Sequence, residues 1–304
     1  MINITNIYYT YTIYYGIMQL GDDFMETYKD MHIHSTHSDG SESIPSLLEQ
    51  LSQKNIGTFA ITDHDSIEGI KELETIKPSL EWYPGVEVST IYKTHKIHLL
   101  GYGFDYHNSE LEKLLTWIKN QRRLRFYDMV KNAEQEFCVE IPSTPFEQLE
   151  QKGTILVRPH LMRYLVEQGC GESSEVMDRI EKRCASKISY RADLKWAIES
   201  LKKAKALLLI AHPKEIENES HIEFKSIIEE LIDLGIDGIE VFHSIHEKGD
   251  IRRYCELASE YHLLESGGSD YHGIDRKGRV LGTVTKNKEK VKYLSLVEEL
   301  RKRK

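Results

Sequence analysis

Hydrophobic and polar positions follow two alternating patterns from Lys29 onward. Short apolar runs, typical of buried strands, are separated by stretches in which apolar residues recur every three or four positions, as on one face of a helix. The apolar runs predict seven strands, at residues 28–35, 57–64, 82–90, 96–103, 206–213, 235–243 and 263–272. Helical spacing is clearest at residues 43–54, 193–205, 223–234 and 247–261. Strands that alternate with helices predict an α/β fold on a parallel sheet, and seven strands suffice to close or nearly close a barrel.

One interval breaks this alternation. Residues 104–205 separate two predicted strands, which is far more chain than one crossover helix requires. The interval contains several stretches with helical spacing, including "LEKLLTWIKNQRRLRFYDMVKNAEQEF" and "RPHLMRYLVEQG". We therefore expect a barrel domain at residues 26–106 and 192–304, and a small helical subdomain inserted at residues 107–191.

Residues 1–25 form an N-terminal extension of different character. The first twenty residues carry no charged side chain and are rich in Tyr, Ile and Thr. A β-prone edge segment is one interpretation. The other, which we favour, is a translated leader ahead of a functional start at Met25, and neither assigns a function to the segment.

The composition is that of an ordinary folded protein, with 29% charged and 40% hydrophobic residues. A net charge of −9 argues against duplex DNA as a partner but allows a compact anionic ligand held by cations. The four cysteines have no CxxC spacing, which predicts reduced thiols rather than disulfides or a thiolate zinc site. No apolar run is long enough to span a bilayer and no signal peptide is recognisable, so we expect a cytoplasmic protein without membrane contact.

Histidine, aspartate and glutamate residues gather where the predicted strands end. His32 and His34 share one face of a strand because side chains two residues apart point the same way, and Asp270 and His272 are spaced alike. The other candidates of these residue types are Asp39, His64, Glu87, His98 and His212. Nine ligands are too many for one tetrahedral zinc ion and suit a cluster of two or three divalent metals, with Mn, Fe or Zn favoured by imidazole and carboxylate without thiolate.

These motifs resemble those of the PHP (polymerase and histidinol phosphatase) family of metal-dependent phosphoesterases. The motifs are "HIH", "HSDG", "AITDHD", "GVEVS", "IHLLGYG", "AHP" and "GGSDYHG", in that order along the chain. The resemblance implies a distorted (β/α)7 TIM-like barrel and three groups of metal ligands. One group would be His32, His34, Glu87 and Asp270; the second would be Glu87, as a bridge, with His98 and His212; the third would be Asp39, His64 and His272.

The long insert resembles one branch of this family, whose members hydrolyse nucleoside 3′,5′-bisphosphates or trim short RNA from its 5′ end. By that resemblance the insert contributes substrate contacts, with Arg158 as the main candidate for a phosphate and His160 and one of Arg122 or Arg125 behind it. Alternatively, Arg158 pairs with an acid of the insert. His243 would contact the substrate, support a ligand or cap its strand.

Other residues near the motifs have less defined roles. His37 and His95 lie off the family pattern, so we expect neither to bind metal. Asp63 and Asp65 would either orient ligands through hydrogen bonds or shape a turn.

The expected activity is hydrolysis of a phosphate ester of a small nucleotide, or of the 5′ end of short single-stranded RNA, by water activated on the metals. Asp270 would act as base or orient the water, and His212 or His272 would protonate the leaving oxygen; the sequence does not choose between the two. A histidinol-phosphate phosphatase is an alternative that fits the length and insert less well. A metal-stabilised structural or regulatory module is the non-enzymatic alternative, and loss of ligands would be its mark. The sequence gives no expectation for the oligomeric state.

Overall fold

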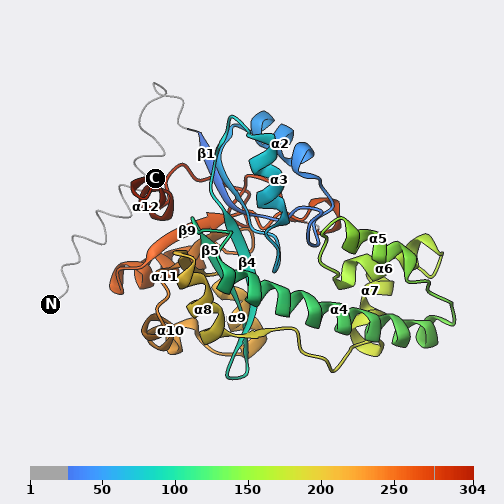
Figure 1. The fold of residues 1–304 in the computed structure, drawn as a ribbon. Coiled ribbons are helices and arrows are strands. Elements are labelled where there is room, and N and C mark those ends of the chain that lie inside the picture. Colours follow the sequence, from blue (N-terminus) through green and yellow to red (C-terminus); the bar gives the residue numbers. More distant parts are fainter. Residues whose placement is uncertain (1–26, 277) are drawn as a thin grey trace.

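The computed structural model describes residues 27–276 and 278–304, and its chain trace is an α/β fold (Figure 1). The predicted extension at residues 1–25 lies outside the described residues. The strands are β1 Tyr28–Ile33, β2 Ile56–Ile61, β3 Glu81–Trp82, β4 Gly85–Tyr92, β5 His95–Tyr102, β6 Ala192–Asp193, β7 Leu207–Ile210, β8 Gly238–His243 and β9 Leu264–Gly268. The helices are α2 Ile44–Gln53, α3 Glu68–Ile76, α4 Ser109–Phe137, α5 Thr144–Gln151, α6 Arg158–Glu167, α7 Ser173–Arg183, α8 Leu194–Lys203, α9 Pro213–Ser220, α10 Ile228–Leu234, α11 Lys248–Glu260 and α12 Ser295–Lys302, with 3₁₀ turns η1 Phe224–Ser226 and η2 Gly273–Asp275.

The strands form two sheets that are connected at two places. One sheet has the order β1-β2-β3 and is parallel, and the other has the order β6-β4-β5-β7-β8-β9. Single bridges join the two sheets, between Ile33 and Tyr271 on one side and between His64 and Glu87 on the other. The two bridges bring the carboxyl ends of β1 and β2 against β4 and the segment after β9.

The prediction of a parallel sheet is wrong for β5, which runs antiparallel to both β4 and β7. Only Lys93 and Thr94 separate β4 from β5, and Lys93 has φ of 54°. Parallel neighbours need a long crossover, so a two-residue connection allows only a hairpin. As a consequence His98 lies in the middle of its strand, yet it shares a face with Glu87 because Ser89 is paired with His98 and lies two residues from Glu87.

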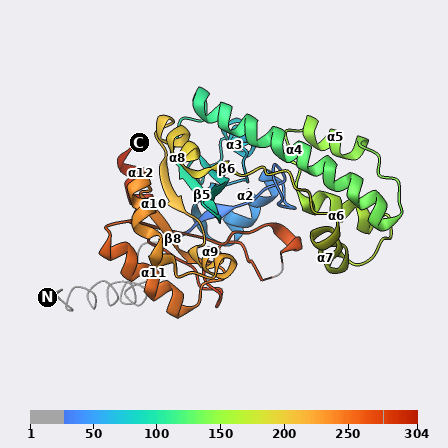
Figure 2. The same ribbon diagram turned by 90° about the horizontal axis from the view of Figure 1, so that it is seen from below.

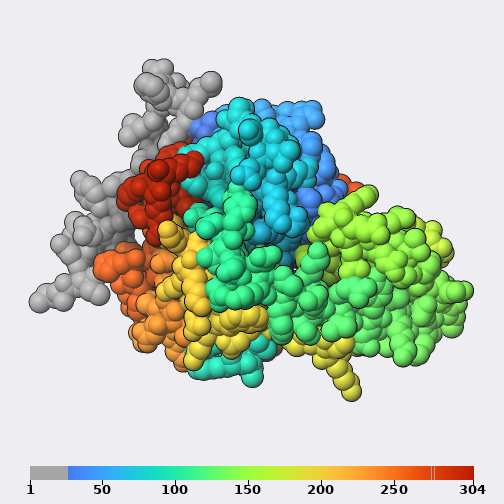
Figure 3. Space-filling model, in the orientation of Figure 1, coloured from blue at the N-terminus to red at the C-terminus, as the bar shows by residue number. Residues whose placement is uncertain are grey.

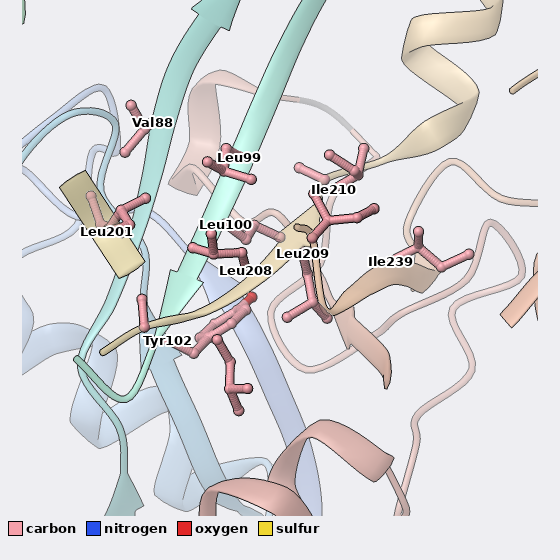
Figure 4. Packing of buried hydrophobic residues seen from close by; sticks show 14 of the residues in the cluster. Val88, Leu99, Leu100, Tyr102, Leu201, Leu208, Leu209, Ile210 and Ile239 are labelled. Atoms are coloured by element: carbon pink, nitrogen blue, oxygen red, sulfur yellow. The ribbon is translucent and has the colours of Figure 1, made fainter. Parts of the chain in front are cut away.

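The core between the sheet and its helices is built from aliphatic side chains of adjacent strands (Figure 4). Leu99 and Leu100 of β5 pack with Leu208 and Leu209 of β7, all fully buried. Continuous apolar runs of this kind are expected of strands covered on both faces. The packing fixes the strands whose ends carry the candidate ligands.

Helices α4 to α7 form a lobe beside the sheets (Figures 1, 2 and 3). Asn108 caps α4, since its side chain accepts hydrogen bonds from the backbone of Glu110 and Leu111. The lobe has its own buried cluster, in which the Phe126 and Phe146 rings meet edge to face at 4.8 Å. The predicted helical insert therefore forms a packed unit with a core of its own.

The predicted helices outside the insert are present, although residues 223–234 divide into η1 and α10. Helices α3, α9 and α12 were not predicted; they are eight or nine residues long, which is little chain for a periodic signal. Within the described residues, no helix is both long and apolar enough to cross a bilayer.

Gly268 permits the close approach of β9 to β1, and its replacement tests this contact. A β-carbon at Gly268 would overlap Cβ of His32 and lie 2.5 Å from the His32 backbone nitrogen. We expect Gly268→Ala to lower the free energy of unfolding by about 1–3 kcal/mol, measured by urea denaturation. The control is Gly249→Ala in α11, where the added carbon meets nothing within 4 Å. Equal stability of the two variants would contradict the close contact.

Candidate metal centre

All nine predicted ligands lie in one cluster where the two sheets meet. Each is buried except His98, whose side chain is 18% exposed. Ligand atoms of four sets lie within 4.8 Å of one another: His34, Asp39, His64 and His272; His32, His34, Glu87 and Asp270; His64, Glu87 and His98; and His32, Glu240 and His243, of which only His32 was a predicted ligand. The structure therefore brings together the residues that the sequence predicted to share a site.

Glu87 lies at the centre of this cluster, and its two oxygens face different histidines. Oε1 lies 2.8 Å from Nδ1 of His98 and 2.9 Å from Nε2 of His212. Oε2 lies 3.1–3.2 Å from ring nitrogens of three residues, His32, His34 and His64. This division is the arrangement a carboxylate needs in order to bridge two ions.

Asp39 and Asp270 lie near different ring nitrogens of His34. Asp39 Oδ1 lies 3.2 Å from Nε2 of His272, and Oδ2 lies 4.0 Å from Nε2 of His64. Asp270 Oδ1 lies 3.1 Å from Nε2 of His34, whose Nδ1 is 3.8 Å from Asp39 Oδ1. The predicted third group is thus assembled, and His34 lies between it and the first group.

Burial and charge set the protonation of the cluster. Burial alone would raise the pKa of Glu87 and Asp39, but the neighbouring histidines hold both well below the usual range. Burial lowers the pKa of His64 and lowers that of His272 to about 3. Burial also opposes protonation of His32, yet the charges of Glu240 and Glu87 raise its pKa to about 10. A divalent ion would have to displace that proton, because only the neutral imidazole binds metal.

The cluster also fits divalent metals by its unpaired nitrogens. Among the predicted ligands, five histidines have a buried ring nitrogen that makes no hydrogen bond of good geometry: Nδ1 of His34, His64, His98 and His212, and Nε2 of His272, of which all but that of His34 lie within 3.2 Å of a carboxylate oxygen. Unpaired buried polar atoms are costly unless a further partner completes them. Imidazole and carboxylate donors without thiolate are the set that suits Mn, Fe and Zn.

Three residues at the cluster have backbone conformations that are rare outside glycine. The φ angles are 29° for His212, 50° for Asp270 and 54° for Asp65. The backbone N–H of His212 donates to Glu240, and that of Asp270 donates to the carbonyl of His32, both at 2.8 Å. Strain of this kind persists where surrounding contacts hold it, and it is concentrated at functional sites.

Buried carboxylates outside the ligand set hold the loops that carry the ligands. Asp63 accepts hydrogen bonds from the backbone and hydroxyl of Ser35 and from the hydroxyl of Ser38, which fixes the loop between His34 and Asp39. Asp63 thus has the orienting arrangement that was one of its two predicted roles.

Asp30 was missed by the sequence reasoning. It accepts from the backbone of Ser269 at 2.9 Å and of Gly282 at 2.7 Å, and so ties both ends of the loop that carries Asp270 and His272. Burial raises its pKa to about 6. Its signal in the sequence is an acidic residue inside an apolar strand, where a charge needs buried partners.

Two further histidines near the motifs, His37 and His243, contact carboxylates and are not among the nine predicted ligands. His37 pairs with Glu72 at 2.6 Å and does not join the cluster, in agreement with its place off the motif pattern. His243 was a candidate for substrate contact at the mouth of the site. The structure instead buries it completely, with Nε2 at 3.2 Å from Asp270 Oδ2, so its contact is with a ligand.

Comparison with known proteins agrees with this geometry. The model of the PHP domain matches residues 30–168, which include the first five motifs. This match covers somewhat less than half of the chain, which is similar to the PHP family over those residues. His212, Asp270 and His272 lie beyond the matched residues, and their place in the same cluster comes from the structure.

Relatives and a solved structure extend the match over most of the chain. A phosphoribosyl 1,2-cyclic phosphate 1,2-diphosphodiesterase of Eggerthella lenta is 28% identical over 83% of this chain and 96% of its own length. The 5′-3′ exoribonuclease Rnm of Escherichia coli is 29% identical, with 80% and 84% covered. A 3′,5′-nucleoside bisphosphate phosphatase of Chromobacterium violaceum is 26% identical, with 83% and 90% covered. A candidate metal-dependent phosphoesterase of Bifidobacterium adolescentis has a structure with TM-score 0.77 and 25% identity, covering 90% of this chain and 96% of that one.

The insert contacts the loops that carry the predicted metal ligands. Arg163 of α6 donates to the carbonyl of Asp39 at 3.0 Å, and the backbone N–H of Ile155 donates to the carbonyl of His37 at 3.1 Å. Arg122 of α4 is buried and donates to Asp65, next to His64, at 2.7 Å. The lobe is therefore fixed to two loops that supply ligands.

The other predicted substrate contacts of the insert are engaged within it. Arg158 pairs with Glu181 at 2.8 Å, and both side chains are about half exposed, which matches the alternative interpretation of this arginine. Arg125 donates to the carbonyl of Ile188 at 2.8 Å. Nδ1 of His160 accepts from the backbone N–H of Val157 and so caps α6.

Three arginines surround the ring of Tyr190, a residue that the sequence reasoning did not single out. The guanidinium carbons of Arg122, Arg191 and Arg125 lie 4.1, 5.3 and 5.5 Å from the ring centre. Burial and the nearby arginines lower the pKa of Arg125, which indicates positive charge in excess at this position. The sequence signal is "SYRA", where an aromatic and a basic residue precede a predicted helix.

Two further arginines, also missed from the sequence, lie at the metal cluster itself. Arg279 contacts Asp270 and lies 2.9 Å from Glu215. Arg276 is 44% exposed and lies 3.8 Å from Asp270 and 3.9 Å from Asp39. Both follow the "GGSDYHG" motif, so the loop that supplies two ligands also supplies cations.

The position of Glu87 predicts that its loss removes more than one ion. Glu87→Gln keeps the shape of the side chain but lacks the charge that both oxygens share. We expect the purified variant to retain fewer metal ions per chain than His98→Ala, measured by inductively coupled plasma mass spectrometry at one protein concentration. His98→Ala is the control because His98 faces only Oε1. Equal losses in the two variants would contradict the bridge.

Proposed function

We propose that this protein is a metal-dependent phosphoesterase that hydrolyses a phosphate ester of a small nucleotide or the 5′ end of short RNA. The observation that carries this proposal is that the two oxygens of Glu87 face different histidines within a cluster of nine predicted ligands, all of them buried except His98. The prediction of a hydrolase of phosphate esters is confirmed by the family and by the activities in the names of its relatives.

We infer that the two sheets form one distorted (β/α)7 barrel, with a helical insert at residues 107–191. Support comes from the two bridges that join the sheets, and from the Asp270 backbone N–H that donates to the His32 carbonyl between them. In such barrels the active site lies at the carboxyl ends of the strands. A cytoplasmic location stays a prediction.

The site would hold two or three ions of Mn, Fe or Zn. When bound, they would neutralise the charge of the phosphoryl oxygens and lower the pKa of water so that it attacks phosphorus. The residues of the chain supply the rest of the reaction: Glu87 would hold two sites at a fixed separation, and Arg276 and Arg279 would attract the anionic substrate.

The proton-transfer roles of Asp270, His212 and His272 stay predictions. Nδ1 of His272 donates to the carbonyl of Asp270 at 2.8 Å, which leaves Nε2 to face Asp39. Nδ1 of His212 lies 3.2 Å from Glu215, a partly exposed carboxylate. His212 thus has a nitrogen beside a group that can exchange protons with solvent, which favours it over His272 as the acid.

The insert would bind the part of the substrate remote from the metals. Of the cations around Tyr190, Arg122 is paired with Asp65, whereas Arg125 and Arg191 donate to backbone carbonyls that carry no formal charge. Arg158 is paired only at the surface, where an ion pair contributes little. A second phosphate would neutralise this excess charge and form charge-assisted hydrogen bonds.

A diesterase of a cyclic phosphate is a second candidate. The Eggerthella lenta relative is named for this activity and aligns over nearly its whole length. The same metal cluster would serve either reaction, because both begin with attack on phosphorus.

A substrate panel tests the proposed function. The Mn²⁺-loaded protein is given 3′-phosphoadenosine 5′-phosphate, a short 5′-phosphorylated RNA, a ribose 1,2-cyclic phosphate and histidinol phosphate, and released products are quantified. We expect turnover of the bisphosphate or the RNA, and none by Asp270→Ala. Turnover of the cyclic phosphate alone would favour the second candidate. Turnover of histidinol phosphate alone, or of nothing with metal bound, would overturn the proposal.

The role of Arg158 predicts a selective change in KM. Loss of one charge-assisted contact should raise KM of Arg158→Ala for the bisphosphate roughly tenfold or more, and leave KM for a nucleoside monophosphate unchanged. Arg123→Ala is the matched control, since Arg123 is an exposed arginine of α4 that pairs with Glu150. Equal effects on both substrates would exclude a contact with the remote phosphate.

A further inference from the structure

Strand β8 lies between β7 and β9, both of which lead into ligand-bearing segments, yet it supplies none of the nine ligands. All six of its residues are buried, and two of them, Glu240 and His243, are polar side chains with no exposed surface. A buried carboxylate and imidazole in an apolar strand need partners that offset their desolvation. Their partners are metal ligands.

Glu240 holds two ligands from two different strands. Its Oε1 lies 2.9 Å from Nδ1 of His32, and its Oε2 accepts the backbone N–H of His212 at 2.8 Å. The carboxylate can only accept, so Nδ1 of His32 donates to Glu240, and Nε2, on the side of Glu87, is the nitrogen that would offer its lone pair to a metal once its proton is displaced. The same carboxylate fixes the strained backbone of His212.

His243 holds a third ligand, Asp270. The backbone N–H of Ile245 donates to Nδ1 of His243 at 3.3 Å, which assigns the proton to Nε2. Nε2 then donates to Oδ2 of Asp270 at 3.2 Å. Oδ1 of Asp270 is thereby left toward His34, at 3.1 Å.

A register shift in β8 puts these two side chains on one side. Side chains three residues apart on a regular strand point to opposite faces. Glu240 pairs with Ser266 and Phe242 with Gly267, so β8 has one more residue than β9 between these pairs. The extra residue turns His243 to the side of Glu240, as bulges beside active sites do.

We propose that Glu240 and His243 are positioning residues of the metal centre, which fix the tautomer of His32, the backbone of His212 and the orientation of Asp270. Strand β8 would thus position predicted ligands that lie on other strands and on the segments that follow them. The proposal rests on the metal centre of the proposed function, but it concerns metal binding rather than the reaction catalysed.

The test measures Mn²⁺ affinity of the full-length protein without substrate, from free Mn²⁺ by electron paramagnetic resonance. Glu240→Gln keeps the shape of the side chain but replaces one acceptor oxygen with a donor, so either His32 or His212 loses its partner. We expect its apparent Kd to rise about 10- to 100-fold, as is common for partners of metal ligands. Urea unfolding of the metal-free variant is measured alongside, so that a rise in Kd counts only under conditions where the variant is fully folded.

A pair of variants at His243 separates positioning from packing. His243→Gln keeps a side-chain N–H that can donate to Asp270, whereas His243→Phe keeps the ring and loses the donor. We expect His243→Gln to bind Mn²⁺ more tightly than His243→Phe, while both unfold at similar urea concentrations.

Several outcomes would overturn the proposal: an unchanged Kd in Glu240→Gln, equal Kd values in the two His243 variants, or losses of affinity explained by unfolding. The His243 pair decides if Glu240→Gln does not fold. Absence of phosphoesterase activity with normal Mn²⁺ binding would overturn the proposed function and leave this inference standing.

Discussion

Five histidines face the two oxygens of one buried carboxylate, Glu87. The positions of the other predicted ligands depend on these contacts. An ionised carboxylate without exposed surface is stable only when charges or hydrogen bonds compensate its lost hydration. Here the compensation comes from residues of both sheets, and the bridge between His64 and Glu87 is where the sheets join. The constraint that forms the site is therefore also one that holds the two sheets together.

A second set of buried acids keeps the ligands in place. Asp30, Asp63 and Glu240 each accept hydrogen bonds from loops or rings that carry a ligand. These bonds hold His212 and Asp270 in backbone conformations that would otherwise cost free energy. A site organised in this way is set before an ion arrives, which reduces the reorganisation that binding requires.

The insert, which we propose binds part of the substrate, is hydrogen-bonded to loops that carry predicted metal ligands. Arginines of the insert lie around Tyr190, which packs against the main hydrophobic core, and Arg122 joins that group to Asp65, the neighbour of His64. A phosphate bound by the insert would thus lie close to loops that supply ligands. The predicted metal ligands lie where the two sheets meet, and selection among phosphorylated substrates would reside in the lobe.

The sequence by itself determined the α/β class and the inserted helices and predicted nine candidate ligands, because strand and helix periodicity and ordered motifs are local properties of the chain. It did not determine the direction of β5, since apolar alternation is the same in parallel and antiparallel strands. Nor did it determine the partners of Arg158 and Arg122, which depend on how helices pack. Only the tertiary structure placed Glu240 and His243 beneath the ligands, because their common side follows from a register shift between two strands and their partners lie on other strands.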